Sequence, residues 1–283
     1  MNDAKKSGVI AFYERHPINE DEILAKVAAR GANPDALTED DLKDFDQDHY
    51  GGVAVLEALA DRAGIRDGQH VLDVCSGMGG PARWLAWRRG CRVTGLDFTA
   101  SRVEAAKRLS RRVRLDHLVD FVYGDATAMP LPASTYDVLI AQEAWLHIPD
   151  KPALIAECVR VAKPGGVIAF TDAIVRSPLD PETGVRLAAG MHTANLASAE
   201  GYAALLRSNG CTIEVQEDLS EPWKDILVKR LEMYRSLRST TVAKFGEARY
   251  LEFDRVYSHF VGCFVANQLG GVRMVARKAG RAP

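Results

Sequence analysis

Several features that would place the chain in a particular class of protein are missing from its sequence. No run of 18 apolar residues occurs in its 283 residues, so no membrane-spanning helix is expected. The first residues, MNDAKKSGVIAFYERHP, lack the apolar stretch of a signal peptide. The net charge is −2 and no long basic block is present, which disfavours a nucleic-acid partner. These absences predict a cytoplasmic protein without membrane or nucleic-acid partners.

Cysteine is scarce, and its spacing excludes two further roles. The five cysteines are an odd number, lie far apart and form no CxxC pair. They are therefore typical of reduced thiols rather than of disulfides or zinc ligands. No cluster of His, Asp and Glu has the spacing of metal ligands, so no metal site is predicted. With 47% hydrophobic residues, the chain can nevertheless bury a full core.

Strand and helix patterns alternate along the middle of the chain. We predict strands over 70–75, 92–97, 119–123, 136–142 and 167–172, and helices over 80–89, 101–113 and 151–162. A helix over 198–208, a strand over 212–217, helical stretches between 221 and 268 and a last strand over 272–278 follow. Apolar strands separated by helices indicate a parallel sheet covered on both faces. The expected fold is α/β and doubly wound, with a Rossmann-like core and an antiparallel edge strand on a mostly parallel sheet.

The first 65 residues are predicted to be helical and to form a cap over this core. Asn19 and Thr38 are placed to cap the helices that follow them. The segment DQDHYGG over 46–52 interrupts the helical pattern, because adjacent glycines favour a change of backbone direction. The expected division is a cap over 1–65, a cofactor-binding core over 66–174, a lid over 175–197 and 221–271, and remaining core elements over 198–220 and 272–283.

The stretch HVLDVCSGMGGPA, residues 70–82, joins the first predicted strand to a helix through a glycine turn. Gly77, Gly79 and Ala82 satisfy the pattern G-x-G-x-x-G/A. Asp97 ends the second predicted strand, where an acidic side chain can bind ribose hydroxyls. This pattern fits NAD and S-adenosylmethionine (SAM) alike.

The charge at the turn favours SAM over NAD. Asp73 places a carboxylate at the end of the first strand, beside the position of a pyrophosphate, and like charges repel at that range. SAM brings an ammonium and a sulfonium instead. Pro81, early in the helix, removes an N–H that a pyrophosphate would use. A cationic ligand is therefore favoured, while an NAD site and a ligand-free turn stay open as alternatives.

Three segments in order carry a resemblance to a known family. VLDVCSGMGGPARWLA, VTGLDFTASRVEAAKRL and the stretch from VYGDATAMP to AFTD resemble the successive motifs of class I SAM-dependent methyltransferases. Within that family the chain most resembles the small-molecule group of sarcosine/dimethylglycine and phosphoethanolamine N-methyltransferases and sugar or natural-product O-methyltransferases. DQDHYGG is similar to a segment that closes over SAM in that group. Cys75 is a departure, because the family often has glycine there.

The resemblance implies SAM as cofactor, S-adenosylhomocysteine as product, and a set of cofactor-binding residues. The turn would border the methionine moiety, the second strand end would hold the ribose, and the following segments would hold the adenine. The implied residues are Gln47 and Tyr50 in the cap, Asp73, Gly77 and Gly79 at the methionine, Asp97 at the ribose, Phe98, Asp125 and Ala126 at the adenine, and Gln142 after the fourth strand.

Two residues are candidates for catalysis. A sulfonium is a strong methyl donor, so a base is needed only when the acceptor must lose a proton. His147 follows the fourth strand and Asp172 ends the fifth, which places both at the carboxyl edge of the sheet. In sugar O-methyltransferases that the chain resembles, a His and an Asp at matching positions serve as base and partner. A His147 that caps the helix near Asp150, and an Asp172 that caps a turn, are the alternatives.

The acceptor is expected to contact the lid, and its identity stays open. Basic residues of the run KRLEMYRSLRSTTVAKF could meet an anionic acceptor, although solvent exposure is the default. Apolar and aromatic side chains at helical spacing could belong to core or pocket, namely Met191, His192, Trp223, Met233, Tyr234, Tyr250, Tyr257 and Phe260. The favoured function is methyl transfer to an oxygen or nitrogen of a small metabolite. Methylation at carbon on a natural-product or lipid-like acceptor, which an apolar lid pocket would favour, is an alternative; a SAM-bound protein that binds or isomerises a ligand is another. A homo-oligomer could form through the lid.

Overall fold

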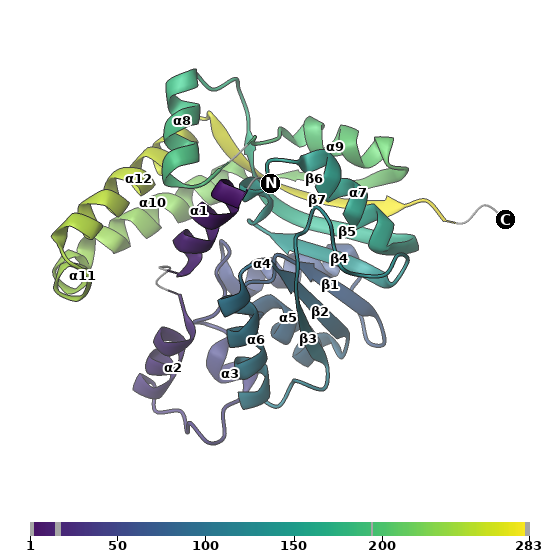
Figure 1. Ribbon diagram of the computed structural model, residues 1–283, viewed down its shortest axis with the longest axis horizontal. Coiled ribbons are helices and arrows are strands. Elements are labelled where there is room, and N and C mark those ends of the chain that lie inside the picture. Colours follow the sequence, from purple (N-terminus) through teal and green to yellow (C-terminus); the bar gives the residue numbers. More distant parts are fainter. Residues whose placement is uncertain (1–2, 15–17, 194, 281–283) are drawn as a thin grey trace.

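A seven-stranded sheet forms the centre of the computed structural model, which describes residues 3–14, 18–193 and 195–280 (Figure 1). The strands are β1 (His70–Val74), β2 (Arg92–Asp97), β3 (Val119–Tyr123), β4 (Tyr136–Gln142), β5 (Ala162–Val175), β6 (Cys211–Asp218) and β7 (Leu269–Lys278). Their order across the sheet is β3-β2-β1-β4-β5-β7-β6. Strands β1 to β5 pair in parallel, whereas β7 is antiparallel to both β5 and β6. The predicted doubly wound, mostly parallel α/β fold is confirmed.

The strand order reverses between β1 and β4, and this point fixes where a ligand can bind. Strands β2 and β3 extend from β1 in one direction, and β5 continues from β4 in the other. Asp73 near the end of β1 pairs with Gly95 of β2 and Ile140 of β4. In open α/β sheets, a crevice forms outside the carboxyl ends of the strands at such a reversal. The glycine turn after β1, Asp97 and Gln142 share this edge of the sheet.

Helices cover both faces because successive strand residues point to opposite sides of the sheet. Val71 packs with α4 (Gly52–Ala63), α5 (Gly80–Arg89) and α6 (Ala100–Arg112). Its neighbour Leu72 packs on the other face with α7 (Lys151–Val161) and α9 (Ala199–Ser208). Helix α4 lies within the predicted cap, yet its buried Leu56 and Leu59 belong to the core beneath the sheet. This part of the N-terminal region therefore covers a sheet face.

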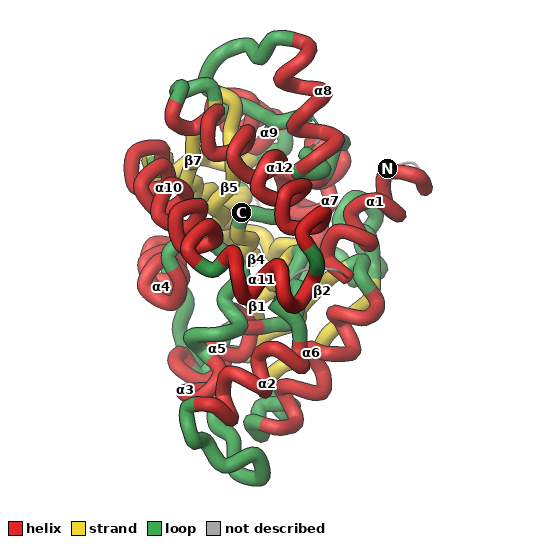
Figure 2. The backbone as a smooth tube through the Cα atoms, turned by 90° about the vertical axis from the view of Figure 1, so that its left-hand side faces the viewer, coloured by secondary structure: helices red, strands yellow, loops and turns green. Residues whose placement is uncertain are grey.

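The remaining helices surround the carboxyl edge of the sheet. The N-terminal ones are α1 (Asp3–Glu14), α2 (Glu20–Ala29) and α3 (Glu39–Leu42). We call α8 (Pro181–Gly190), α10 (Ser220–Ser236), α11 (Arg238–Phe245) and α12 (Glu247–Val265) the lid helices. Helices α10 and α12 pack side by side (Figure 2) and bury Trp223, Leu227 and Phe260 in a cluster of their own. Figure 1 shows α1 between the lid helices and the sheet.

Local sequence signals account for several helix boundaries. The Asn19 side chain accepts a hydrogen bond from the N–H of Glu22, which caps α2. Thr38 and Asp41 form a capping box at the start of α3. Gly51 and Gly52 both have positive φ, 87° and 61°, so the expected change of direction occurs before α4. The predicted helical stretch between 221 and 268 divides at Leu237 and Gly246 into three helices.

Two absences expected from the sequence concern the membrane and the thiols. Over the ranges given above, no helix is long and apolar enough to cross a membrane. All five cysteines are unpaired, and Cys91, Cys158, Cys211 and Cys263 are buried. The expectation of free thiols is confirmed.

The position of α4 on the sheet can be tested by truncating its buried face. Leu59 is fully buried, so Leu59→Ala should lower the free energy of unfolding by about 2–5 kcal/mol, the usual cost of emptying a buried leucine site. The matched control is Leu251→Ala on α12, because Leu251 is 53% exposed and should change stability by less than about 0.5 kcal/mol. Urea unfolding measures both. Equal effects of the two substitutions would place α4 outside the core.

Candidate functional site

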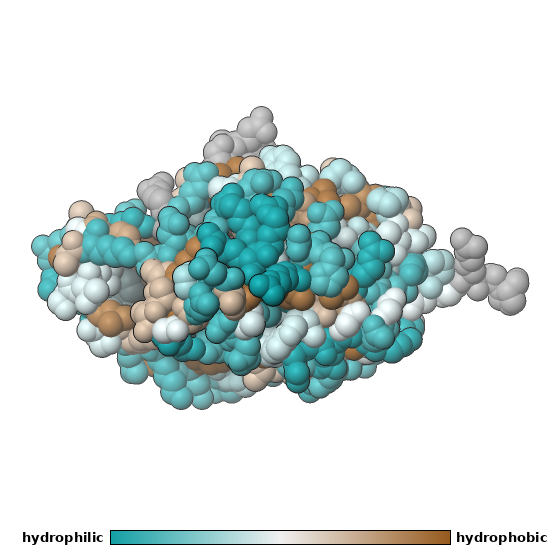
Figure 3. Space-filling model, turned by 90° about the horizontal axis from the view of Figure 1, so that it is seen from below, coloured by the Kyte–Doolittle hydropathy of each residue, from teal (hydrophilic) through white to brown (hydrophobic). Residues whose placement is uncertain are grey.

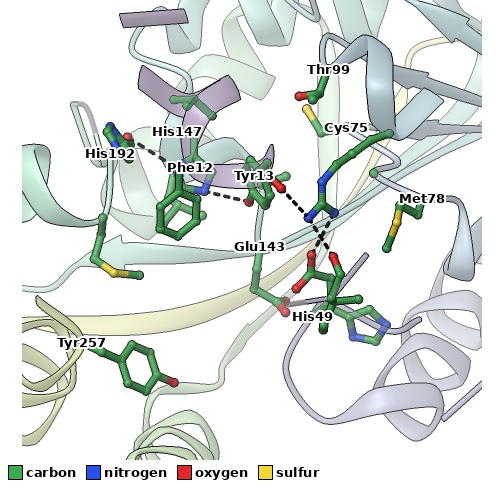
Figure 4. Close-up of a pocket in the computed structure, with 18 of the residues that line it drawn as sticks. Phe12, Tyr13, His49, Cys75, Met78, Thr99, Glu143, His147, His192 and Tyr257 are labelled. Atoms are coloured by element: carbon green, nitrogen blue, oxygen red, sulfur yellow. Dashed lines mark hydrogen bonds and ion pairs between the residues drawn. The ribbon is translucent and has the colours of Figure 1, made fainter. Parts of the chain in front are cut away.

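A cavity of about 1080 Å³ lies at the carboxyl edge of the sheet, between the core, α1 and the lid helices (Figure 4). Its volume exceeds what one drug-sized ligand usually needs, since such pockets span roughly 300–1,000 Å³. The sequence-predicted site residues that line it are Gln47, Tyr50, Asp73, Gly77, Asp97, Phe98, Asp125, Ala126, Gln142 and His147. The fold therefore gathers side chains that lie up to a hundred residues apart in the sequence.

Gly79 is predicted to border the ligand, but it lies outside the cavity wall. Its φ is 76°, in the left-handed region that favours glycine. A Cβ atom at this position would lie 2.3 Å from Cζ of Phe121, closer than two carbon atoms can approach. Gly79 also precedes the first residue of α5 as its N-cap. We therefore assign this glycine to the shape of the turn and not to ligand contact.

Two buried carboxylates face the cavity from adjacent strands. Asp97 accepts hydrogen bonds from the backbone N–H groups of Gly77 (2.9 Å) and Thr99 (2.8 Å). Asp73 is buried as well, and its Oδ2 has no hydrogen-bond partner among the residues placed by the structure. Burial and the nearby charge of Asp97 raise the pKa of Asp73 to about 7. Burial also raises the pKa of Asp97. A positively charged ligand would stabilise the ionised form of these buried carboxyl groups, so the pair favours such a ligand.

Other polar atoms in the same wall are buried without protein partners. They are Oγ of Ser76, Nδ1 of His49 and both side-chain atoms of Gln142, considering the described part of the chain. Buried polar groups in proteins nearly always have a partner, so an unpaired set that lines a cavity indicates a polar ligand. SAM offers donors and acceptors on its amino-acid, ribose and adenine parts together with positive charge. The donor set of this wall fits such a molecule.

Arg83 connects the glycine turn to the segment from Asp46 to Tyr50, which we call the cap segment. Its guanidinium is fully buried and donates to Asp46 (2.5 Å), to Glu39 (3.1 Å) and to the carbonyl oxygen of Met78 (2.7 Å). A Cβ atom on Gly80 would lie 2.4 Å from the carbonyl oxygen of Asp46, so the two segments are in direct contact. The segment from Asp46 to Tyr50 therefore closes one side of the cavity.

His147 lies in the cavity wall beneath α1. The hydroxyl of Tyr13 donates to Nε2 of His147 at 3.0 Å, and the carbonyl oxygen of His192 lies 3.3 Å from Nδ1 (Figure 4). These partners assign the ring proton to Nδ1 and leave the Nε2 lone pair toward Tyr13. Burial lowers the pKa of His147 to about 4, so the ring is neutral at neutral pH. Burial raises the pKa of the Tyr13 hydroxyl.

The sequence reasoning missed Tyr13. It is separated from His147 by 134 residues, and it lies on a short helix whose docking no local pattern predicts. The only available signal was the adjacent aromatic pair Phe12 and Tyr13 on an amphipathic N-terminal helix. The rings of Phe12 and His192 are in edge contact at 5.5 Å, which also fastens this helix over the cavity.

Asp172, the second catalytic candidate, lies away from the cavity. Its carboxylate is fully buried and accepts from the backbone N–H of Leu146 (3.1 Å) and the hydroxyl of Tyr202 (2.7 Å). It does not line the cavity, and within the described chain no hydrogen bond joins it to His147. Asp172 instead supports the short 3₁₀ helix η1 (Trp145–His147) that carries His147. We therefore do not propose Asp172 as a catalytic residue.

Glu143 fastens the cap to the sheet from the other side of the cavity. Its carboxylate accepts from the N–H of Tyr50 and the hydroxyl of Thr171, both at 2.5 Å. Its φ of 46° is positive, a strained conformation for glutamate. Burial raises the pKa of Glu143 to about 8, so much of it is protonated at neutral pH. Trp145, by contrast, packs against Phe170 in the core.

The lid side of the cavity is mainly aromatic and aliphatic. Tyr234 stacks on Tyr250 with ring centres 5.0 Å apart, and Phe253 stacks on Tyr257 at 5.4 Å. Of the lid residues named from the sequence, Met191, His192, Met233, Tyr234, Tyr250 and Tyr257 line the cavity. Trp223 and Phe260 pack between the helices instead.

Comparison with known proteins agrees with the fold and shows the family. Residues 72–170 match the sequence family described as "Methyltransferase domain". The chain is 30% identical over 225 residues to the 27-O-demethylrifamycin SV methyltransferase of Amycolatopsis mediterranei, which covers 78% of this chain and 82% of that protein. It is 32% identical over 174 residues to the methyltransferase GfsG of Streptomyces halstedii, which covers 60% of this chain. The match spans only 62% of the length of GfsG.

A solved structure shows the same fold. The phosphoethanolamine N-methyltransferase 2 of Haemonchus contortus, in complex with phosphomonomethylethanolamine and S-adenosylhomocysteine, superposes with a TM-score of 0.75 at 21% identity. The superposition covers 95% of this chain and 60% of that one. The chain therefore belongs to the SAM-dependent methyltransferases, as the resemblance of its motifs indicated, and SAM is the cofactor of this family.

The contribution of Asp97 to cofactor binding can be measured directly. Asp97→Ala removes a buried carboxylate whose charge-assisted hydrogen bonds are worth about 1.5–3 kcal/mol each. We expect SAM to bind about 10- to 100-fold more weakly in isothermal titration calorimetry. Asp120→Ala is the control, because Asp120 is an exposed carboxylate on the neighbouring strand. Unchanged affinity in Asp97→Ala would place the ribose elsewhere.

The raised pKa of Asp73 predicts a dependence on pH with a defined sign. The Asp73 carboxyl group has a pKa of about 7 in the folded state, compared with an ordinary pKa of 3.8. The folded state therefore binds the proton more tightly, and the stability gained from protonated Asp73 is lost as the pH rises from about 4 to 7. SAM favours the ionised carboxylate, so SAM affinity should rise between pH 6 and 8 as binding releases the proton. Asp73→Asn should make both dependences shallower in urea unfolding and calorimetry. If the SAM affinity of Asp73→Asn changed with pH in the same way as that of the unmodified protein, Asp73 would be excluded from cofactor binding.

Proposed function

We propose that the protein transfers a methyl group from SAM to an oxygen or nitrogen of a small metabolite. The observation that carries the proposal is the Tyr13–His147 hydrogen bond in the wall of a cavity that also holds two buried carboxylates. A cationic methyl donor suits the carboxylates, and a protic acceptor suits the neutral histidine. The names of the Amycolatopsis and Haemonchus relatives, an O-methyltransferase and an N-methyltransferase, support the same reaction class.

The cofactor end of the site would be formed by the core and the cap. SAM supplies the methyl group as an electrophile on positively charged sulfur. Asp73 and Gly77 would border its methionine moiety, Asp97 its ribose, and Phe98 its adenine. Asp125, Ala126 and Gln142 would complete the wall from the core, and Gln47 and Tyr50 would complete it from the cap. The segment held by Arg83 would exclude water from the reacting centre.

Tyr13 and His147 would handle the acceptor proton. For a hydroxyl acceptor, the Tyr13 oxygen takes the acceptor proton while the Tyr13 proton passes to Nε2 of His147. The Nδ1–H group stays bonded to the carbonyl of His192, which keeps the ring in place. A neutral amine acceptor needs only orientation, because its lone pair is already available. The same pair of residues therefore serves oxygen and nitrogen acceptors.

A second candidate reaction is methylation at carbon. The observation that favours it is the apolar character of the lid wall, where Met233, Leu237, Phe253 and Val256 line the cavity. Such a wall suits a natural-product or lipid-like acceptor. Mass spectrometry and NMR of the methylated product distinguish a new C–CH₃ group from an O- or N-methyl group.

Several finer expectations remain proposals. The unpaired cysteines support a reducing compartment such as the cytoplasm. We propose a division into an N-terminal region over 1–65, of which α4 covers the sheet, a core over 66–174, a lid over 175–197 and 221–271, and remaining core elements over 198–220 and 272–283. We expect no nucleic-acid partner. Contact between two copies through the lid is supported by the exposed Leu237, Phe245 and Leu251. Figure 3 shows a mostly hydrophilic face with small, scattered hydrophobic patches. One of them lies toward the left-hand end, the side where α11 lies in Figure 1.

Removal of His147 tests the proposed reaction. His147→Ala and Tyr13→Phe should each lower turnover of a hydroxyl acceptor by about 10²-fold or more, since general base catalysis contributes that much. S-adenosylhomocysteine affinity should stay within about twofold. Transfer of radiolabel from methyl-labelled SAM across a panel of alcohols, phenols and amines measures turnover. His117→Ala, at an exposed position, is the control.

Two outcomes would change the assignment. Retained turnover in both variants would remove the proton-transfer role and favour an amine acceptor. Tight SAM binding by the unmodified protein, without S-adenosylhomocysteine formation from any acceptor, would support a protein that binds or isomerises its ligand instead.

A further inference from the structure

The cavity carries opposite charges at its two ends. Carboxylates lie at the core end, where Asp73 and Asp97 end adjacent strands. Arg102, which also lines the cavity, forms an ion pair with Asp48 at 3.2 Å. At the lid end the wall carries four arginines, which come from three lid helices. They are Arg186 of α8, Arg230 of α10, and Arg249 and Arg255 of α12.

Arg230 is the most enclosed of the four arginines. Its Nη2 donates to the backbone carbonyl of His49 at 2.9 Å, and its guanidinium carbon lies 5.0 Å from the ring centre of Tyr50. In the described residues, no carboxylate lies within ion-pair distance of Arg230, Arg186 or Arg255. A guanidinium has five N–H donors, so Arg230 retains donors and an unbalanced charge.

The acidic residues that line the lid end do not cancel this charge. Glu143 forms no ion pair with Arg230 over the described residues, and its two carboxylate oxygens accept hydrogen bonds from the N–H of Tyr50 and the hydroxyl of Thr171 instead. Glu252 is exposed and, in the part of the chain that the structure describes, forms no ion pair with Arg230, Arg186 or Arg255. The lid end of the cavity is therefore positive.

Other arginines on the same helices behave differently. Arg235 of α10 pairs with Asp254 at 2.7 Å, and Arg238 of α11 pairs with Glu247 at 2.6 Å. Neither arginine lines the cavity. The lid thus neutralises arginines on its outer side, while Arg230, Arg186 and Arg255 in the cavity wall have no such partner.

We propose that the acceptor carries an anionic oxygen group, a carboxylate or a phosphate, which Arg230 binds with the help of Arg186 and Arg255. Guanidinium groups bind both kinds of anion through paired N–H donors. The apolar part of the cavity wall, which includes Tyr257 and Met191, would contact the body of the acceptor. This proposal rests on the proposed methyl transfer, because it names the acceptor class for the same cavity.

Electrostatics supports this orientation of the acceptor. SAM would place its positive charge near Asp73 and Asp97, and a cationic acceptor would be repelled by both SAM and the lid arginines. An acceptor with its anion at Arg230 keeps that charge away from the core carboxylates. Its nucleophilic group can then face His147, Tyr13 and the methyl group. The volume of about 1080 Å³ leaves room for an acceptor beside the cofactor.

Matched probes test the proposal through binding. We would titrate the full chain, saturated with S-adenosylhomocysteine, with p-coumarate, its methyl ester, p-coumaryl alcohol monophosphate and tyramine. These phenols share a hydroxyl nucleophile and differ in the charge at the other end. We expect the carboxylate and the phosphate to bind at least about tenfold more tightly than the ester, and tyramine to bind most weakly. The tighter of the two anions identifies the source of the negative charge.

Variants assign the preference to Arg230. Arg230→Met should remove the difference between acid and ester, and Arg230→Lys should restore part of it because the charge returns without the paired donors. Arg255→Met should reduce the preference to a smaller extent. The control is Arg235→Met on the outer side of α10, which should leave the preference unchanged. S-adenosylhomocysteine affinity, measured in parallel, verifies that each variant is folded.

The possible results separate this proposal from the proposed reaction. Equal binding of acid and ester, absence of binding by both anions, or an equal loss in Arg235→Met and Arg230→Met would overturn it. Methyl transfer to neutral acceptors without anion preference would leave the reaction standing and remove the proposed acceptor class. Anion preference without S-adenosylhomocysteine formation from SAM would keep the Arg230 site and remove the reaction.

Discussion

The buried ion cluster of Arg83 is the interaction on which the cavity depends. One guanidinium binds Asp46 of the cap segment, Glu39 of α3 and a carbonyl of the glycine turn. Charges are costly to bury unless they are paired, and loss of one partner leaves an uncompensated charge in the interior. The cap segment is therefore held against the glycine turn, and this side of the cavity is closed. Glu143 and Arg230 bind the other end of this segment at Tyr50 and His49.

The arrangement of charge around the cavity is consistent with methyl transfer from a cation. Burial raises the pKa of both carboxylates at the strand ends, and the charge of Asp97 raises that of Asp73 further. A neutral histidine bonded to a tyrosine lies opposite them, and arginines lie at the lid. In the proposed reaction, the carboxylates would bind the cofactor, the histidine would accept the proton of the nucleophile, and the arginines would bind the anionic part of the acceptor. The reversal of strand order between β1 and β4 brings the strand ends to one crevice, and the lid helices add the arginines.

Local patterns predicted the elements well. Strands β2, β3 and β4 and helix α5 have the predicted bounds, because strand and helix periods are properties of neighbouring residues. The caps at Asn19 and Thr38 follow from the same short-range chemistry. The residues predicted for the cofactor side, among them Asp73 and Asp97, line one cavity, since strand ends in a parallel sheet meet at one edge. Their contact with the cofactor stays a prediction. Gly79 and Asp172 were correctly placed at the carboxyl edge of the sheet. Neither lines the cavity, which their spacing in the sequence could not predict.

The sequence by itself determined the fold class and the family, and it predicted residues that line the core side of the cavity, because each depends on motifs of a few consecutive residues. Tertiary structure decided the rest. Tyr13 reaches His147 across 134 residues, and Arg230 reaches the cap across 181 residues. Such contacts depend on how helices dock through apolar faces, and this docking has no short-range signature. The same reason explains Asp172, whose burial under Leu146 and Tyr202 makes it a support for His147 instead of its partner.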